Sequence, residues 1–167
     1  MRVGLCGKMR AGKDSCAEYL QGKYGGVVLK FATPLYDMQK AVYEIAGLPE
    51  RKDRSLLQFL GTNWGRSIDT NIWVNVMAKK IDSLPETTNI FLSDLRFSNE
   101  EQMLREKGFT IIKVEVDDKK LLERGASLVT HESERWIVDY TGADYTIKND
   151  STIVRLHEKL DVLANLF

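Results

Sequence analysis

A glycine-bounded segment near the N-terminus has the composition and spacing of a phosphate-binding loop. Residues 7–13 read Gly-Lys-Met-Arg-Ala-Gly-Lys and match G-x-x-x-x-G-K, between a strand-like and a helix-like run. Glycines let the backbone curl so that successive N–H groups point at phosphate oxygens, and the following helix adds its positive dipole end. Lys13 would reach the β- and γ-phosphates of a nucleoside triphosphate. The residues expected to bind these phosphates are Gly7, Arg10, Ala11, Gly12, Lys13, Asp14 and Ser15.

The residue after the loop lysine departs from the general form of this motif. Asp14 stands where serine or threonine usually holds a magnesium ion, and Ser15 comes next. Asp14 could hold magnesium through a water molecule, and the Ser15 hydroxyl could contact a phosphate instead. A glycine-rich turn with a solvated lysine is the alternative interpretation of residues 7–13. The strand before and the helix after the loop favour phosphate binding.

An apolar run that ends in an acid predicts a second part of the site. Residues 90–94 read Ile-Phe-Leu-Ser-Asp, and an acid at the end of such a strand can hold the magnesium shell or bind the acceptor. Arg96 projects to the same side as Asp94 if the strand continues, and Glu100 lies one helical turn beyond. The alternative is an N-capping network at the junction between this strand and the next helix, with Asn99 and Glu100 solvated.

The segment from Arg51 to Arg66 is rich in cationic and aromatic residues. Cations precede a short helix, and a turn of sequence Gly-Thr-Asn-Trp-Gly-Arg follows it. Arginine and lysine suit a monophosphate, and aromatic rings can stack on a base. For the two tryptophans a place in the core is an equally good interpretation. The candidates for acceptor binding are Arg54, Trp64, Arg66 and Trp73.

Further charged residues follow the fourth main strand. Arg124, with Lys119 and Lys120 upstream, could be brought onto a transferring phosphate by a mobile segment, and a solvated helix face is the alternative. His131 is either a phosphate contact or a surface or capping residue, and we expect His157 to be structural. The candidates for catalysis are Lys13, Asp94, Arg96 and Arg124.

Apolar runs alternate with amphipathic runs, which predicts an α/β fold with a largely parallel sheet. The expected strands cover residues 2–6, 27–31, 90–95, 109–116 and 145–148. The expected helices cover residues 13–24, 34–46, 56–60, 72–83, 98–107, 118–124, a stretch up to 140, and 152–166. The last helix should present Ile153, Leu156, Leu160 and Leu163 on one face.

The overall composition is that of an ordinary globular protein. The 167 residues include 24 Lys and Arg and 24 Asp and Glu, so net charge gives no reason to expect a nucleic-acid partner. Apolar runs fall short of the roughly 18 residues that span a bilayer, and the N-terminus turns polar early for a signal peptide. The two cysteines, Cys6 and Cys16, are expected to be free thiols. We therefore expect a cytoplasmic protein without a membrane partner.

Several motifs occur in the same order as in the bacteriophage deoxynucleoside monophosphate kinases, which this chain resembles over nearly its whole length. They are residues 7–15, Phe-Ala-Thr-Pro-Leu at 31–35, Leu-Gly-Thr-Asn-Trp-Gly-Arg at 60–66, Asp-Leu-Arg-Phe-Ser-Asn-Glu at 94–100 and His-Glu-Ser-Glu at 131–134. The resemblance implies a three-layer P-loop fold like that of adenylate kinase, with a five-stranded parallel sheet and helices on both faces. It also implies an acceptor-binding insertion at about 34–84 and a lid at about 117–135.

The resemblance further implies ATP with Mg²⁺ as donor and a deoxynucleoside 5′-monophosphate as acceptor. The motif match puts Lys13 and Ser15 on the donor side. It puts Arg54, Thr62, Trp73, Asp94, Arg96 and Glu100 at the acceptor. An aspartate after the loop lysine is common in this family, and residues 149–152 resemble a segment near the adenine of ATP.

Other acceptors stay open at this point, among them dephospho-coenzyme A, phosphomevalonate or a sugar acid. A nucleotide-binding module without kinase activity, or a structural domain with an accidental loop, are further alternatives. Base preference and a homodimeric state are also open, and a viral protein would act in the host cytoplasm.

Overall fold

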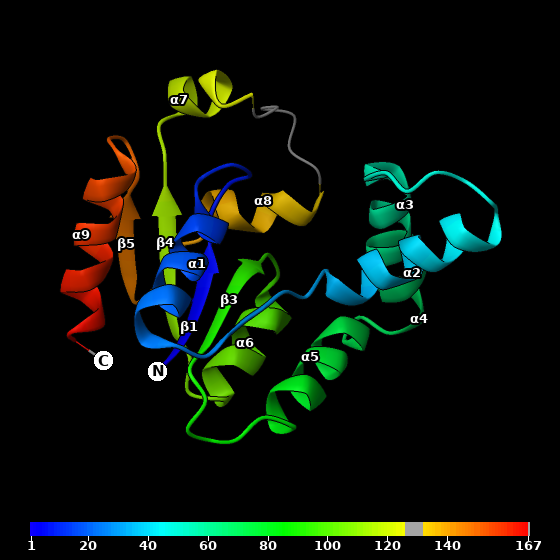
Figure 1. Ribbon diagram of the computed structural model, residues 1–167, viewed down its shortest axis with the longest axis horizontal. Coiled ribbons are helices and arrows are strands. Elements are labelled where there is room, and N and C mark those ends of the chain that lie inside the picture. The colour runs from blue at the N-terminus through cyan, green and yellow to red at the C-terminus, as the bar shows by residue number, and fades with distance from the viewer. Residues whose placement is uncertain (126–131, 167) are drawn as a thin grey trace. The chain divides into compact units, whose positions relative to one another are not determined.

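The computed structural model describes residues 1–125 and 132–166. The chain divides into two compact units, one formed by Met1–Leu29 with Pro85–Phe167 and the other by Lys30–Leu84 (Figure 1). We call them the sheet unit and the helical unit, and each is described by itself.

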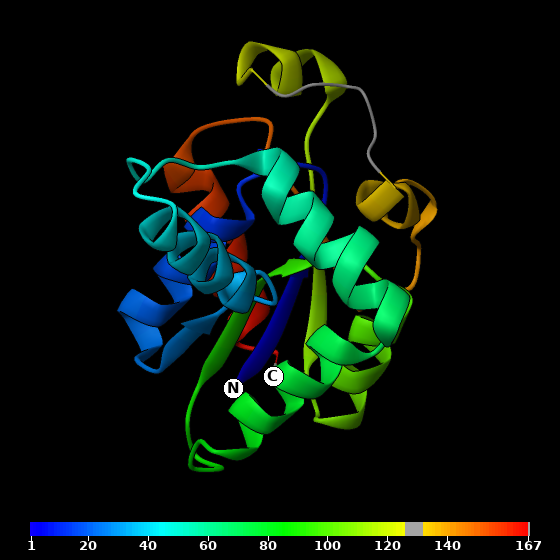
Figure 2. The same ribbon diagram turned by 90° about the vertical axis from the view of Figure 1, so that its right-hand side faces the viewer.

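The sheet unit is built on five parallel strands, as the alternating pattern predicts. They are β1 (Arg2–Cys6), β2 (Val27–Leu29), β3 (Ile90–Leu95), β4 (Thr110–Glu115) and β5 (Tyr145–Lys148). Their order is β2-β3-β1-β4-β5, so β1 lies in the middle of the sheet (Figure 2). Gly4 of β1 pairs with Leu92 on one side and Ile111 on the other. The loop after β1 therefore leaves the centre of the carboxyl edge, where parallel sheets bind ligands.

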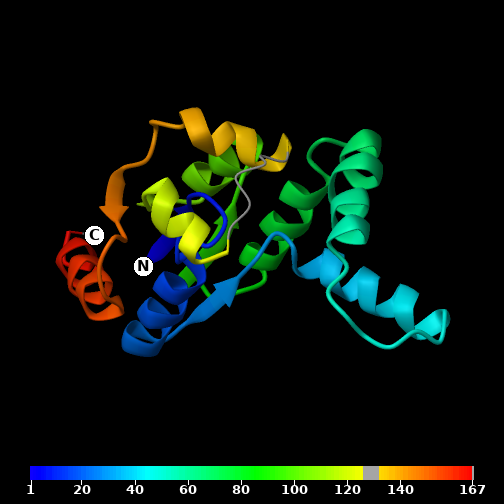
Figure 3. The ribbon, with the colours of Figure 1, turned by 90° about the horizontal axis from the view of Figure 1, so that it is seen from above.

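One face of this sheet is covered by α1 (Lys13–Tyr24) and α9 (Ile153–Ala164) (Figure 3). Cys16 and Leu20 of α1 join Leu156 and Leu160 of α9 and strand residues in the main core. Ile153, predicted on the same face as Leu156 and Leu160, is the first residue of α9 and is 50 % exposed.

Polar contacts reinforce the packing of α1 against α9. Tyr19 stacks on His157 with ring centroids 3.8 Å apart, and the Tyr19 hydroxyl donates to Asp161 Oδ1 at 2.8 Å. Lys23 pairs with the same carboxylate at 2.7 Å. His157 therefore lies in a helix–helix contact, which agrees with its expected structural role.

The opposite face carries α6 (Ser98–Glu106) and α8 (Glu132–Asp139) (Figure 3). A polar cluster connects them: Glu101 accepts hydrogen bonds from Arg105 Nε at 2.7 Å and from the Tyr140 hydroxyl at 2.5 Å. Burial and the Glu101 hydrogen bond raise the pKa of Tyr140. Arg105 also pairs with Asp144, whose carboxylate accepts from Ile111 N at 2.7 Å. The cluster thus fixes the connection into β5.

The helical unit contains α2 (Thr33–Ile45), α3 (Arg54–Gln58), a π-helix η1 (Phe59–Gly65), α4 (Arg66–Ile68) and α5 (Ile72–Asp82). Asp53 caps α3 by accepting from Leu56 N at 3.0 Å and from the Tyr43 hydroxyl at 2.8 Å. Hydrogen bonds from Ser55, Leu56 and Tyr43 lower the pKa of Asp53 to about 2. The segment at 61–66, expected as a turn, is helical instead.

Smaller differences concern the ends of elements. β2 ends at Leu29 rather than at Phe31, and the short helix α7 covers Asp118–Glu123. Cys6 and Cys16 are free, as expected, and burial raises the pKa of both thiols to about 12. None of the helices in the described ranges has the length and apolar composition that a membrane crossing requires.

Candidate phosphate-transfer site

The phosphate loop curls between β1 and α1 through three residues with positive φ, which are Gly7 at 143°, Arg10 at 63° and Gly12 at 102°. A Cβ on Gly7 would lie 2.3 Å from the carbonyl oxygen of Val114, so only glycine fits beside β4. The Ala11 N–H donates to Lys8 O at 3.1 Å and tightens the turn. The backbone therefore has the tight curl that G-x-x-x-x-G-K predicts.

Lys13, the first residue of α1, folds back over this loop. Its Nζ donates to Gly7 O at 2.8 Å and to Lys8 O at 2.9 Å. The lysine thus holds both ends of the curl together, and its ammonium group lies at the loop that would receive phosphate oxygens. The positive end of α1 adds to the same field.

Asp14 is held by Ser93 of β3, which the sequence motifs did not single out as a site residue. The Ser93 hydroxyl donates to Asp14 Oδ1 at 2.6 Å, and Ser93 is 1 % exposed whereas Asp14 is exposed. The hydrogen bond fixes one carboxylate oxygen in the first turn of α1. A serine next to Asp94 in an otherwise apolar strand was the signal for this partner. The magnesium role of Asp14, and the phosphate contact of half-buried Ser15, stay predictions.

Glu100 occupies the start of α6, after the end of β3. β3 ends at Leu95, as predicted, so the condition under which Arg96 would project to the same side as Asp94 is not met. The Glu100 carboxylate, 2 % exposed, accepts from Arg96 N at 2.8 Å and Phe97 N at 3.2 Å. The hydrogen bonds match the N-capping alternative, but Glu100 is buried, whereas that alternative expected it to be solvated. Asp94 and Arg96 are half-buried beside it, and their roles at the acceptor stay predictions.

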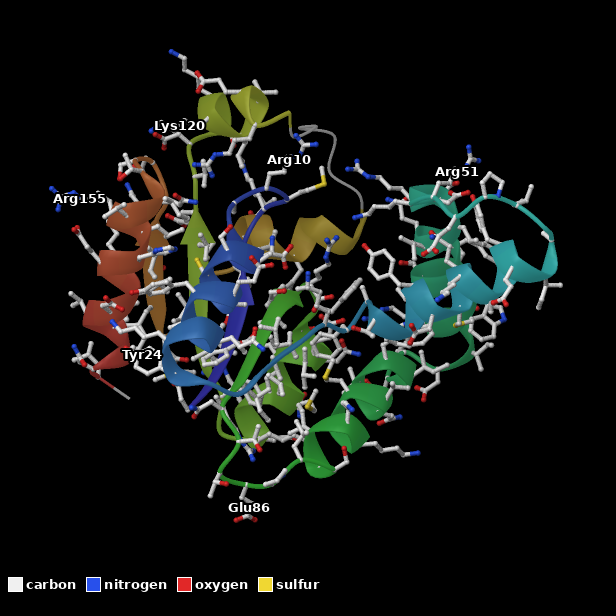
Figure 4. All side chains as sticks on the ribbon, in the orientation of Figure 1. Arg10, Tyr24, Arg51, Glu86, Lys120 and Arg155 are labelled. Carbon is white, nitrogen blue, oxygen red and sulfur yellow. The ribbon has the colours of Figure 1, made fainter. Side chains whose placement is uncertain are left out.

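Arg124, at the C-terminal end of α7, contacts the phosphate loop directly. Its guanidinium donates to Arg10 O at 3.3 Å and to Asn149 O at 3.0 Å. The Arg10 side chain extends toward α7 and donates to Arg124 O (Figure 4). Lys8 forms an ion pair with Asp118 at 2.6 Å. α7 is thus connected to the loop at two points, and a contact of Arg124 with a transferring phosphate stays a prediction.

A cavity of about 250 Å³ lies beside the first residues of the loop. Its lining combines apolar residues of β4 and α8 with charged groups, among them Lys8, Lys148 and Asp150. Lys113 also lines it and donates to Tyr140 O at 2.7 Å. The sheet unit therefore has a partly open cavity next to the phosphate loop.

The helical unit carries the remaining predicted site residues. Arg54 and Trp64 are exposed, Thr62 is half-buried, and Arg66 donates to Thr70 O at 3.0 Å. Trp73, 6 % exposed, donates from Nε1 to Gly61 O at 2.8 Å. This matches the core interpretation of Trp73, and the acceptor contacts of the five residues stay predictions. His131 lies outside the described residues.

The strand–loop–helix geometry, with the loop at the centre of the carboxyl edge, defines the P-loop kinase fold. Shikimate kinase from Aquifex aeolicus has a TM-score of 0.60 at 18 % identity, covering 99 % of this chain and 96 % of that one. A gluconokinase from Sinorhizobium meliloti has a TM-score of 0.57 at 17 % identity, covering 99 % and 92 %. These likenesses show the fold alone.

The chain belongs to the deoxynucleotide monophosphate kinase family, whose model matches residues 52–160. A relative from Acanthamoeba polyphaga mimivirus is named "Putative deoxynucleotide monophosphate kinase". It is 26 % identical to this chain, and the alignment covers 95 % of this chain and 93 % of the relative. The protein is thus a phosphotransferase of the nucleotide kinase type.

Proposed function

We propose that this protein transfers the γ-phosphoryl group of ATP to the phosphate of a deoxynucleoside 5′-monophosphate. The proposal rests chiefly on the position of Lys13, whose Nζ donates to Gly7 O and Lys8 O within a tightly curled phosphate loop. The mimivirus relative's name supports the acceptor class. Kinase chemistry needs little covalent participation by the protein, so positioning and charge neutralisation suffice.

The residues of the sheet unit fit a triphosphate with magnesium. The loop offers backbone N–H groups and Lys13 for the phosphates, and the adjacent cavity of about 250 Å³ offers space beside them. Carboxylate and hydroxyl oxygens are the ligands that Mg²⁺ prefers, and Asp14 is oriented by Ser93 at 2.6 Å. When bound, the ion would neutralise charge on the terminal phosphates. Asp14 would hold it through a water molecule, with Asp94 as a further oxygen ligand.

The reaction that we propose is an in-line displacement. An oxygen of the acceptor phosphate forms a bond to the γ-phosphorus, the bond from that phosphorus to the β,γ-bridging oxygen breaks, and ADP leaves with the bonding electrons. A phosphomonoester has its second pKa near 6, so the attacking oxygen is already ionised at neutral pH and a general base is dispensable. Lys13 would follow the transferred charge, and Arg54 and Arg96 would hold the acceptor.

A substrate panel tests this proposal. Purified protein is incubated with ATP, Mg²⁺ and each common ribo- and deoxyribonucleoside monophosphate, and ADP and diphosphate formation are measured. We expect turnover with at least one deoxynucleotide. Turnover only with acceptors outside this class, such as dephospho-coenzyme A or a sugar acid, would refute the acceptor, and nucleotide binding without any turnover would refute the kinase.

Lys13→Ala tests the assignment of the donor site. Loss of a phosphate-binding lysine should lower kcat by about 10²–10⁴-fold, while the thermal unfolding midpoint changes little. Lys79→Ala, an equal truncation of an exposed lysine of α5, is the control and should retain wild-type activity. Wild-type turnover by Lys13→Ala would end the assignment.

A further inference from the structure

We infer that Asn149 is a positioning residue for the donor phosphates, because its side chain sets the orientation of the peptide group between Ala11 and Gly12 in the phosphate loop. The inference rests on the proposed function and deepens it. It assigns a phosphate-loop role to a residue of the segment between β5 and α9.

The backbone of Asn149 is held by hydrogen bonds to residues outside the phosphate loop. Its backbone N–H donates to Glu115 O, at the end of β4, at 2.7 Å. Its carbonyl oxygen accepts from Arg124 Nη2 at 3.0 Å, and the residue is only 8 % exposed. Two elements therefore hold the backbone of Asn149, so its amide group is presented to the phosphate loop in a set direction.

The side chain of Asn149 then binds one loop carbonyl. Its Nδ2 donates to Ala11 O at 2.8 Å, and Ala11 is fully buried. In a planar trans peptide the C=O and the N–H point in opposite directions. Because the Ala11 carbonyl points into the protein at Asn149, the Gly12 N–H points away from Asn149, to the side from which phosphate oxygens would approach.

Gly12 and Asn149 also depend on each other sterically. A Cβ on Gly12 would lie 2.5 Å from Asn149 Nδ2, and Gly12 has φ 102°. The phosphate loop's own curl favours glycine at this position, and a Cβ there would also displace the Asn149 amide from Ala11 O. Arg124 completes the arrangement by donating to Arg10 O, the preceding carbonyl, at 3.3 Å. Two consecutive loop carbonyls are therefore occupied by side chains of other elements.

The test compares Asn149→Ala and Asn149→Asp with the wild type and with Asn165→Asp, an exposed site with the same charge change. Calorimetry gives the Kd of MgATP, of inorganic tripolyphosphate, which has phosphates and no base, and of the deoxynucleoside monophosphate. We expect the Kd of MgATP and of tripolyphosphate to rise about 10- to 100-fold in both Asn149 variants. This is the loss expected when the Gly12 N–H no longer donates a hydrogen bond to a charged phosphate oxygen. Asp should be the worse, because its carboxylate repels Ala11 O and the phosphates.

The other measurements separate positioning from a general structural role. We expect an unchanged Kd for the monophosphate, an unfolding midpoint within a few degrees of the wild type, and wild-type behaviour of Asn165→Asp. An unchanged tripolyphosphate Kd would overturn the inference, and so would an equal loss of monophosphate affinity with a large fall in the midpoint. If tripolyphosphate binding depended on Asn149 but the wild type phosphorylated no acceptor, the proposed function would fail and the inference would stand.

Discussion

Removing the Glu100 carboxylate distinguishes helix capping from acceptor binding. Glu100 is 2 % exposed and accepts hydrogen bonds from Arg96 N at 2.8 Å and Phe97 N at 3.2 Å. Glu100→Ala would leave both N–H groups without this acceptor, at about 1–3 kcal/mol for each group that stays dry. Because Arg96 is half-buried and water can reach part of this junction, we expect a total loss of about 2–4 kcal/mol.

The assay is equilibrium unfolding in urea together with a thermal scan. For a chain of this size the expected loss corresponds to a fall of about 5–15 °C in the unfolding midpoint. Glu100→Gln keeps an oxygen acceptor of the same length and should lose about half as much free energy, since the charge is gone. Glu106→Gln, an exposed site in the same helix, is the control and should stay within about 0.5 kcal/mol of the wild type.

The acceptor interpretation predicts a different pattern. If Glu100 binds the monophosphate, Glu100→Gln should raise the KM for that substrate about tenfold or more with an unchanged midpoint. Unfolding of Glu100→Ala within about 0.5 kcal/mol of the wild type would refute the capping argument.

Two further predictions follow from titrating groups. The pKa of Asp53 is lowered to about 2, so its contribution to stability is complete above the unfolded-state pKa near 3.9 and is lost as pH falls through about 2. Asp53→Asn should therefore show a smaller loss of unfolding free energy between these pH values than the wild type. Equal profiles of unfolding free energy against pH for the two proteins would contradict this prediction. Burial raises the pKa of Cys6 and Cys16 to about 12, so a thiol-specific reagent at about pH 8 should label both only after unfolding; rapid labelling of the native protein would contradict it.

The sequence predicted the parts of the site that are contiguous in the chain. The loop at 7–13 lies between β1 and α1, and β3 and β5 have the bounds that their apolar runs indicate. These features depend on local backbone preferences and on strand periodicity, which are encoded within a few residues. The family was likewise predicted from short contiguous motifs that occur in the same order along the chain.

The π-helix η1 shows where local reasoning failed. The two glycines and the asparagine in residues 59–65 are typical of a turn, whereas the segment is helical. Trp73, 12 positions after Gly61, donates its indole N–H to Gly61 O, and a Cβ on Gly65 would lie 2.5 Å from the Trp73 ring. The contact depends on how α5 packs, which a turn propensity cannot encode.

The chain by itself determined that a phosphate loop exists and which lysine serves it, because both are set by residues that are neighbours in sequence. Only the tertiary structure decided which side chains hold that loop. Asn149 is 138 positions from Ala11, and Ser93 is 79 from Asp14. They meet because the order β2-β3-β1-β4-β5 places β3 and β4 on either side of β1 and β5 next to β4. That order is a consequence of packing the whole sheet, so the partners of the loop could not be found from its motif.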